Sequence, residues 1–363
     1  MSPDPNAQDG FFTADAGEFS PHLAHEPLLS AARPRLAFDP GRDWGQWRAE
    51  LRQTLHRLLG QMPENVAPDL RVLRTIDREH YAERQFLFRA EPHADVPGHL
   101  LTPRGAPPAA GWPVMICLQG HSTGMHISLG RAKFEGDQAG IDGGRDLALQ
   151  ALRRGMAALV MEVRCFGLRQ DGRPSGIQMG IAGCRHAAMA ALLLGRTAIG
   201  ERCWDIARAI DLVESGALGS LDARRIGITG NSGGGTLSYW AACLDERIAA
   251  CMPSCYFCPM ADSIGRIGHC ECNYVPGALL EFDLPDLAGL IAPRPLVIVA
   301  GQRDEIFPVE AVRRGFRTVQ RIYAAAGRAD ACRLCVGPEG HRYYPDLAWP
   351  ALAELTGWIT ESR

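Results

Sequence analysis

Short apolar runs alternate with longer stretches of helical periodicity along most of this chain. The apolar runs are rich in Val, Ile, Leu, Ala and Cys, which is typical of buried strands. These strands are predicted at 113–118, 157–163, 225–229, 249–255, 295–300 and 332–336. The helices are predicted at 144–154, 185–194, 204–215, 235–244, 308–326 and 349–360. The alternation predicts an α/β fold, with a mostly parallel central sheet and helices on both faces.

The N-terminal part of the chain follows a different pattern. Residues 1–40 show little periodicity, and they predict an arm that lies on the surface or packs loosely. Asp43 is an N-cap candidate for a helix that runs to Leu59, with apolar residues recurring every three or four positions. We expect this helix to cover part of the main domain or to form a subunit contact. The arm and helix therefore make up a predicted N-terminal segment, 1–66.

The remaining chain, 67–363, is predicted to be one domain. Residues 70–101 alternate between apolar and polar positions over short distances. Segments 83–88 and 98–103 predict antiparallel strands that open the sheet before the strand–helix alternation begins.

Composition narrows the class of protein. The chain has 363 residues, of which 46% are hydrophobic and 22% are charged, as in soluble globular enzymes. Its net charge is −3 and no Lys/Arg run stands out, so a nucleic-acid partner is not expected. Residues 1–26 lack the pattern of a signal peptide, and no apolar stretch approaches the roughly 18 residues of a membrane helix. We therefore expect a cytoplasmic protein with no membrane partner.

The segment 226–235 carries the most specific motif. An apolar run ends in Gly230-Asn231-Ser232-Gly233-Gly234, and a predicted helix follows. This Gly-x-Ser-x-Gly pattern is typical of a nucleophile elbow, a sharp strand-to-helix turn that exposes a strained serine. The glycines two residues either side of the serine allow close backbone approach. Ser232 is therefore the predicted nucleophile of a hydrolase or acyltransferase that forms an acyl-serine.

A serine hydroxyl needs an adjacent base, and the base needs an acid that orients it. Asp304 follows the predicted strand 295–300 and is the predicted acid, with Glu305 as the alternative. His341 follows the predicted strand 332–336 and is the predicted base. Three candidates at strand ends, in the chain order Ser, acid, His, are much more specific than any one of them.

The oxyanion hole needs two backbone N–H donors. Gly233 is the first predicted donor, because it follows the nucleophile directly, and His121, in the loop after strand 113–118, is the second. The long segments 120–142 and 253–285 are predicted to form the walls and lid of the substrate pocket. The candidate pocket residues are Gln119, Arg164, Asn231, Tyr256 and Tyr274.

Twelve cysteines are present, and we interpret most of them as reduced, buried thiols. One group could bind zinc: Cys255 and Cys258 followed by Cys270 and Cys272. The second pair has only one intervening residue instead of the usual two to four. We therefore expect core or loop thiols, no metal and no cofactor.

Several motifs occur together with this constellation. They are Leu118-Gln119-Gly120-His121, Gly230-Asn231-Ser232-Gly233-Gly234, Asp304-Glu305-Ile306-Phe307-Pro308 and Gly340-His341. Supporting motifs are Gly195-Arg196-Thr197-x-x-Gly200, which leads into Trp204-Asp205-x-x-Arg208-Ala209-x-Asp211, and Ala292-Pro293-Arg294-Pro295. From about residue 95 onward the chain thereby resembles the acetyl xylan esterase and dienelactone hydrolase-like branch of the α/β-hydrolases. The resemblance implies the α/β-hydrolase fold and hydrolysis of short-acyl, acetyl-type esters of a carbohydrate or related small molecule. A dienelactone hydrolase proper uses a cysteine nucleophile, so Ser232 argues against that activity.

Two other functions share this scaffold. A serine peptidase of the prolyl-oligopeptidase type has the same core, but residues 1–100 are too few for the large β-propeller that such peptidases usually carry. A non-catalytic binding module would be indicated by loss of a triad residue, and none is lost. The expected partner is a small-molecule ester, and the helix at 43–59 weakly suggests a homo-oligomer.

Overall fold

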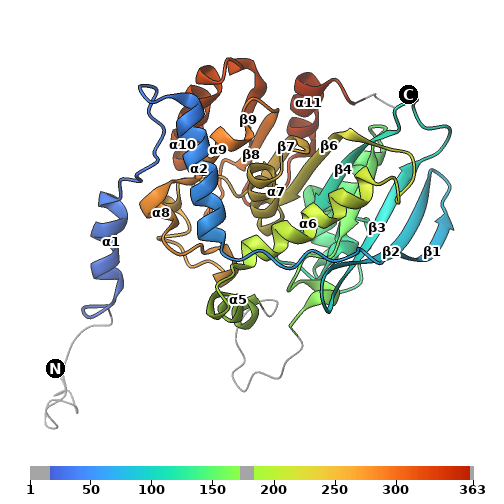
Figure 1. Cartoon of the computed structure of the whole chain (residues 1–363), viewed down its shortest axis with the longest axis horizontal. Coiled ribbons are helices and arrows are strands. Elements are labelled where there is room, and N and C mark those ends of the chain that lie inside the picture. Colours follow the sequence, from blue (N-terminus) through green and yellow to red (C-terminus); the bar gives the residue numbers. More distant parts are fainter. Residues whose placement is uncertain (1–16, 172–183, 360–363) are drawn as a thin grey trace, which may run out of the picture.

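The computed structural model describes residues 17–171 and 184–359, and these ranges contain one nine-stranded sheet (Figure 1). The strand order is β1-β2-β3-β5-β4-β6-β7-β8-β9. The strands are β1 (Arg71–Asp77), β2 (Tyr81–Glu91), β3 (Ala94–Pro103), β4 (Trp112–Leu118), β5 (Ala157–Met161), β6 (Leu221–Asn231), β7 (Ile248–Ser254), β8 (Leu296–Gly301) and β9 (Cys332–Gly337).

Strands β1, β2 and β3 pair antiparallel, and β3 also pairs antiparallel with β5. All pairings from β5 through β9 are parallel. The expected strands are confirmed, and β1 is the addition. Its side chains are nearly all exposed, so this edge strand has no buried face and lacks the apolar signal of the others.

Helices cover both faces of the sheet, as expected. On one face, α2 (Trp44–Leu59), α6 (Ala198–Glu214), α7 (Gly233–Leu244), α9 (Leu284–Ile291) and α10 (Val309–Ala325) share one apolar core (Figure 1). On the other face, α4 (Leu147–Leu152) and α11 (Pro345–Thr356) contribute to a second core. The other helices are α1 (His22–Ala31), α3 (Asp137–Gly140), α5 (Cys184–Leu193) and α8 (Ala278–Glu281).

The predicted helix from Asp43 is present, and its buried face packs on α9. The Asp43 side chain accepts a hydrogen bond from the Gln46 N–H, which is the expected N-cap. Trp47 is 1% exposed, and its ring lies against Gly289, where a Cβ would come within 2.4 Å of it. The helix therefore covers the main domain. A subunit contact and the boundary at residue 66 stay predictions.

Within the predicted arm, residues 17–40 are more ordered than their composition suggests. Residues 1–16 lie outside the described part, but α1 forms a helix with no buried residue. Beyond it, Leu36 is fully buried, and the N–H groups of Arg35 and Leu36 donate to Leu280 and Glu281. The arm is thus docked by backbone hydrogen bonds, which its side-chain pattern does not reveal.

Two predicted helix boundaries are wrong for local reasons. Helix α6 begins earlier than residue 204, because the Thr197 side chain accepts from the Gly200 N–H and forms the cap there. Helix α11 begins at Pro345, a residue that the first turn tolerates, and it ends at Gly357, which has φ +64°. Residue 360 lies outside the described part. No helix in the described ranges is both long enough and apolar enough to cross a bilayer.

No helix or strand was predicted in the segment 256–285, and the structure differs near its end. It contains α8 and the first residues of α9, which begins with a reciprocal cap between Asp283 and Asp286. The pattern was missed because helices this short show too few turns to establish a period.

The strand order reverses between β4 and β6, which lie side by side although β5 comes between them in sequence. Leu118 at the end of β4 pairs with Gly230 near the end of β6. Open α/β sheets bind ligands at such a switch point, beyond the carboxyl ends of the strands. The fold therefore brings the loops after β4 and β6 together.

Candidate active site

Ser232 is at the turn between β6 and α7. Its backbone has φ +58° and ψ −122°, a strained conformation for a residue with a side chain. A Cβ on Gly230 would lie 2.4 Å from the carbonyl carbon of Gly234, and one on Gly234 would lie 2.2 Å from the carbonyl oxygen of Leu118. Only glycine fits at these two positions, so the sharp turn predicted from the motif is present.

The loop after β4 lies directly against Ser232. A Cβ on Gly120 would come 2.6 Å from the Asn231 carbonyl oxygen and 2.9 Å from the Ser232 Cβ. The His121 ring is also close, since its Nδ1 is 3.2 Å from where a Gly233 Cβ would stand. The structure thus brings Gly233 and His121, the two residues predicted to supply oxyanion donors, close together beside the serine.

Asp304 and His341 follow β8 and β9 and form a hydrogen-bonded pair. The distance from His341 Nδ1 to Asp304 Oδ2 is 2.9 Å. Burial of Asp304 opposes ionisation, but the His341 ring and the N–H groups of Ile306 and Phe307 together lower the pKa of this carboxyl group. Asp304 is therefore held as an anion that orients His341. Glu305, the alternative acid, is exposed on the same turn.

Two neighbours limit the movement of the His341 ring. Phe307 stacks on it with ring centroids 6.0 Å apart. The Cys255 thiol lies within 4.8 Å of the ligand atoms of both His341 and Asp304 and donates to the Arg342 carbonyl oxygen. Burial raises the pKa of Cys255 to about 12, so this thiol stays neutral beside the pair.

Three predicted pocket residues lie around the elbow. Gln119 is buried, and its amide donates to Ser128 Oγ and to the Arg145 carbonyl oxygen. Asn231 accepts a hydrogen bond from Ser254, and Tyr256 is 1% exposed within the core. These side chains support the loops that carry the site.

The other two predicted pocket residues have different surroundings. The Arg164 guanidinium forms ion pairs with Glu91, Glu201 and Asp205. Tyr274 is 41% exposed, and its hydroxyl donates to a backbone carbonyl of its own loop. Arg164 thus joins β2, α6 and the segment after β5. The sequence showed that it follows a strand, but not that three acids surround it.

A cleft of about 740 Å³ opens beside His341 and the loop after β4. Its lining is rich in polar residues, including His121, Ser122, Arg145 and Arg342. The Nε atoms of both arginines and the Ser122 hydroxyl are buried without a protein partner among the described residues. Arg145 was not among the predicted site residues, because the sequence pattern placed it in the helix predicted at 144–154. It lies instead in an irregular turn, Ile141–Arg145, with Gly144 at φ +80°.

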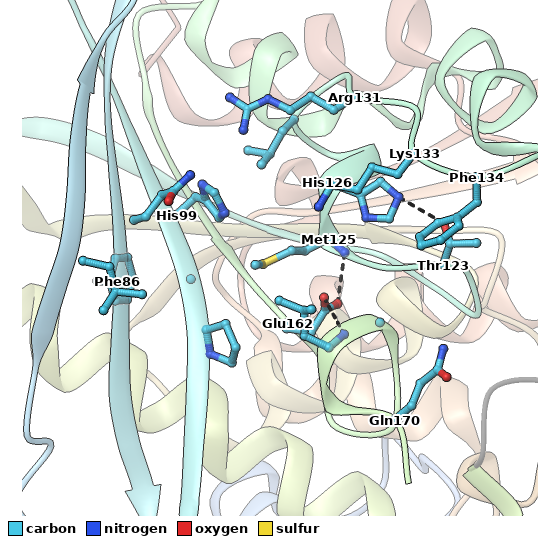
Figure 2. A pocket seen from close by; sticks show the side chains of 17 residues that line it. Phe86, His99, Thr123, Met125, His126, Arg131, Lys133, Phe134, Glu162 and Gln170 are labelled. Atoms are coloured by element: carbon cyan, nitrogen blue, oxygen red, sulfur yellow. Dashed lines mark hydrogen bonds between the residues drawn. The ribbon is translucent and has the colours of Figure 1, made fainter. Parts of the chain in front are cut away.

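A second cavity, of about 720 Å³, lies on the other side of Thr123, toward β2 and β3. Figure 2 shows Glu162 in its wall, with its carboxylate toward Met125. This carboxylate accepts from the N–H groups of Met125 and Leu168, at 3.0 and 3.2 Å. Burial nevertheless raises the pKa of Glu162 to about 7. The carboxylate therefore anchors the loop that separates the two cavities.

The four cysteines weighed as a zinc site are not gathered at one place. Cys255 lies beside Asp304, and Cys258 is buried in the main core. Cys270 and Cys272 lie together, but with His121 and Cys184. The sequence pairs therefore separate in the fold, and a different cluster forms.

Comparison with known proteins agrees with this architecture. The model of the Abhydrolase family matches residues 15–182. "Putative hydrolase YtaP" of Bacillus subtilis is 26% identical over 322 residues, which cover 86% of this chain and all of that protein. A 4-O-methyl-glucuronoyl methylesterase of Phanerochaete chrysosporium is 25% identical over 277 residues, covering 69% of this chain and 51% of that protein.

Solved structures share the fold at lower identity. A "putative acetyl xylan esterase" from Bacteroides fragilis superposes with a TM-score of 0.74 at 18% identity, covering 96% of both chains. A glucuronoyl esterase from Solibacter usitatus has a TM-score of 0.64 at 15% identity, covering 91% of this chain and 99% of that one. The strand order, the elbow and these likenesses together show the α/β-hydrolase fold, and the chain is similar to acetyl xylan esterases and glucuronoyl esterases.

Proposed function

We propose that the protein is a serine carboxylic-ester hydrolase that works through an acyl-enzyme. The observation that carries the proposal is the His341–Asp304 pair, 2.9 Å apart, on the strand ends of the sheet that also bears the strained Ser232. The named relatives, a hydrolase and several carbohydrate esterases, support the same reaction class.

The proposed chemistry uses each of these groups in the role that suits its type. His341 Nε2 removes the Ser232 proton as Oγ attacks the ester carbonyl carbon, and the N–H groups of Gly233 and His121 stabilise the oxyanion. Collapse of this intermediate breaks the bond to the alcohol, which leaves with the proton from His341. His341 then removes a proton from water, which attacks the acyl-serine carbonyl carbon. As the acid leaves, His341 returns that proton to Ser232 Oγ and free Ser232 is restored. Asp304 keeps the imidazole in the required tautomer and stabilises its charged form.

We propose short-acyl, acetyl-type esters of a carbohydrate as the substrate class. The cleft beside His341 is lined by hydroxyl, carboxylate and guanidinium groups, which suit a polyhydroxylated alcohol better than a lipid chain. Ser122, Arg145 and Arg342 line this cleft and carry the kinds of polar group that hydrogen-bond to sugar hydroxyls. The acetyl xylan esterases among the structural neighbours support an acetyl group.

The first test is hydrolysis of p-nitrophenyl esters from acetyl to octanoyl, followed by acetylated xylan and a methyl ester of glucuronic acid. We expect turnover that falls steeply beyond short acyl chains and that Ser232→Ala lowers by on the order of 10⁴-fold or more, with an unchanged melting curve. Ser215→Ala, at the exposed end of α6, is the matched control and should retain full activity.

Each other outcome contradicts a defined part of the proposal. Substantial turnover by Ser232→Ala would remove the serine mechanism. Preference for the glucuronate methyl ester would place the sugar on the acyl side and overturn the acetyl assignment.

A further inference from the structure

A cluster of metal-binding side chains lies beside the candidate active site. The ligand atoms of His121, Cys184, Cys270 and Cys272 are all within 4.8 Å of one another. His121 Nε2 and Cys272 Sγ are 3.3 Å apart. The four residues come from three segments that are distant in sequence: the loop after β4, the start of α5 and the turn near Glu271–Asn273.

The size of the cluster suits a tetrahedral zinc ion. Zn–S bonds of about 2.3 Å and Zn–N bonds of about 2.0 Å place neighbouring ligand atoms roughly 3.5–3.8 Å apart. The spread of up to 4.8 Å needs only a small contraction to reach this geometry. Three cysteines and one histidine are also a common donor set of structural zinc sites.

A buried arginine supplies an independent argument. Arg202 is 3% exposed, and its Nη2 lies 3.3 Å from the Cys184 Sγ. Among the described residues it has no carboxylate partner; its other contacts are the Cys165 and Cys272 thiols, the Arg164 carbonyl oxygen and the Phe166 ring. A buried guanidinium requires a nearby negative charge, and the cluster is where that charge can arise.

We propose that His121, Cys184, Cys270 and Cys272 bind one zinc ion in a closed, four-coordinate site. On binding, each of the three thiols releases its proton to solvent, and neutral His121 coordinates through Nε2. Three thiolates and one Zn²⁺ have a net charge of −1, which the positive charge of Arg202 balances. With all four positions filled by protein, the ion is structural and not a Lewis acid for the ester.

A disulfide explains less of this arrangement. Any one pair would leave a third thiol and the imidazole without a role, and it would leave Arg202 without a counter-charge. The one-residue spacing of Cys270 and Cys272 does not oppose the site, because the other two ligands come from different segments.

The site would tie down the oxyanion loop. His121 coordinates with its side chain, while its backbone N–H is the proposed second oxyanion donor and its Nδ1 lies 3.2 Å from where a Gly233 Cβ would stand. This consequence rests on the proposed function, whereas the zinc site itself does not. A metal measurement without substrate therefore separates the two.

The test is the zinc content of the full chain, purified under reducing conditions without chelators, measured by mass spectrometry of the elements. We expect one zinc per chain, and near-complete loss of it in Cys184→Ser and Cys272→Ser. Cys258→Ser is the matched control, since this thiol is also buried but lies outside the cluster, and it should keep its zinc. Because the two variants could fail to fold, cobalt(II) is added to metal-free wild type, where tetrahedral thiolate absorption bands are expected.

Specific results would overturn the assignment. Wild-type protein that stays metal-free after incubation with zinc under reducing conditions would exclude the site. So would folded Cys184→Ser that retains its zinc. Cys165 also contacts the Cys184 thiol. If Cys165→Ser lost its zinc and His121→Ala retained it, Cys165 would be the fourth ligand in place of His121.

Discussion

Two histidine–aspartate pairs lie in or beside the loop after β4, and one of them, His341–Asp304, has the arrangement of a catalytic pair. His341 and Asp304 are joined through Nδ1 at 2.9 Å, whereas His126 and Asp137 are joined through Nε2 at 2.8 Å. The His341 side chain is 20% exposed beside the cleft, while that of His126 is 7% exposed. The same two residue types therefore occur in two different environments.

The partners of each pair explain the difference. Thr123 and the N–H groups of Lys133 and Phe134 all donate to Asp137, and Thr123 Oγ also contacts His126 Nε2. The His126–Asp137 pair and its partners therefore cross-link residues 123–137 within one loop. The Nε2 of His341 has no protein partner within the described ranges, so it remains available for proton transfer. A His–Asp contact is thus insufficient evidence for catalysis; the unoccupied nitrogen and its position at a strand end are the informative features.

The largest effect that would test this comparison is on catalysis. We expect His341→Ala to lower kcat by about 10⁴-fold or more, because the base is lost. His126→Ala should leave kcat within a few-fold and instead lower the free energy of unfolding by about 2–4 kcal/mol. Steady-state kinetics and urea unfolding of both variants measure this. A folded His126→Ala enzyme with no turnover would break the comparison.

Replacing the two aspartates, Asp304 and Asp137, should give a slightly smaller difference in kcat between the two pairs. Asp304→Asn should reduce kcat by about 10³–10⁴-fold with little change in KM, because the amide favours the wrong imidazole tautomer. Asp137→Asn should mainly destabilise, since its amide N–H₂ would face several donors. The measurements are kcat and the midpoint of urea unfolding for each variant. Equal losses of kcat in both variants would contradict the assigned roles.

The smallest expected effect is on the pH dependence of stability, and it concerns Glu162, which anchors the loop after β4 through the Met125 N–H. Its pKa of about 7, raised from 4.5 by burial, means that the folded protein holds a proton that the unfolded chain releases. Stability from this group is therefore present below pH 4.5 and is lost as the pH rises to about 7, by about 3 kcal/mol in all.

Glu162→Gln mimics the protonated acid and should lose none of this stability over the same range. Urea unfolding of both proteins between about pH 5 and 8 tests this. Glu135→Gln, an exposed acid of the same loop, is the control and should follow wild type. Parallel curves for wild type and Glu162→Gln would show that the carboxylate is already ionised at low pH.

Local patterns were sufficient for much of the fold. Buried strands such as β4 and β8 are almost entirely apolar, so their positions follow from the sequence. The Asp43 cap and the glycines at 230 and 234 specify local geometry through their own chemistry. Errors arose where the local signal was weak or absent: the exposed edge strand β1, the docked arm at Leu36, and the short helix α9.

By itself, the sequence determined the α/β class, the elbow at Ser232, and candidates for the acid and base, because strand burial and turn geometry depend on adjacent residues. Tertiary structure alone decided which distant groups meet. It paired His341 with Asp304 and not Glu305, enclosed Arg164 among three acids, and gathered His121 and Cys184 with Cys270 and Cys272 instead of Cys255 and Cys258. The physical reason is that side-chain contacts across a sheet edge depend on strand order and loop path, which no local pattern encodes.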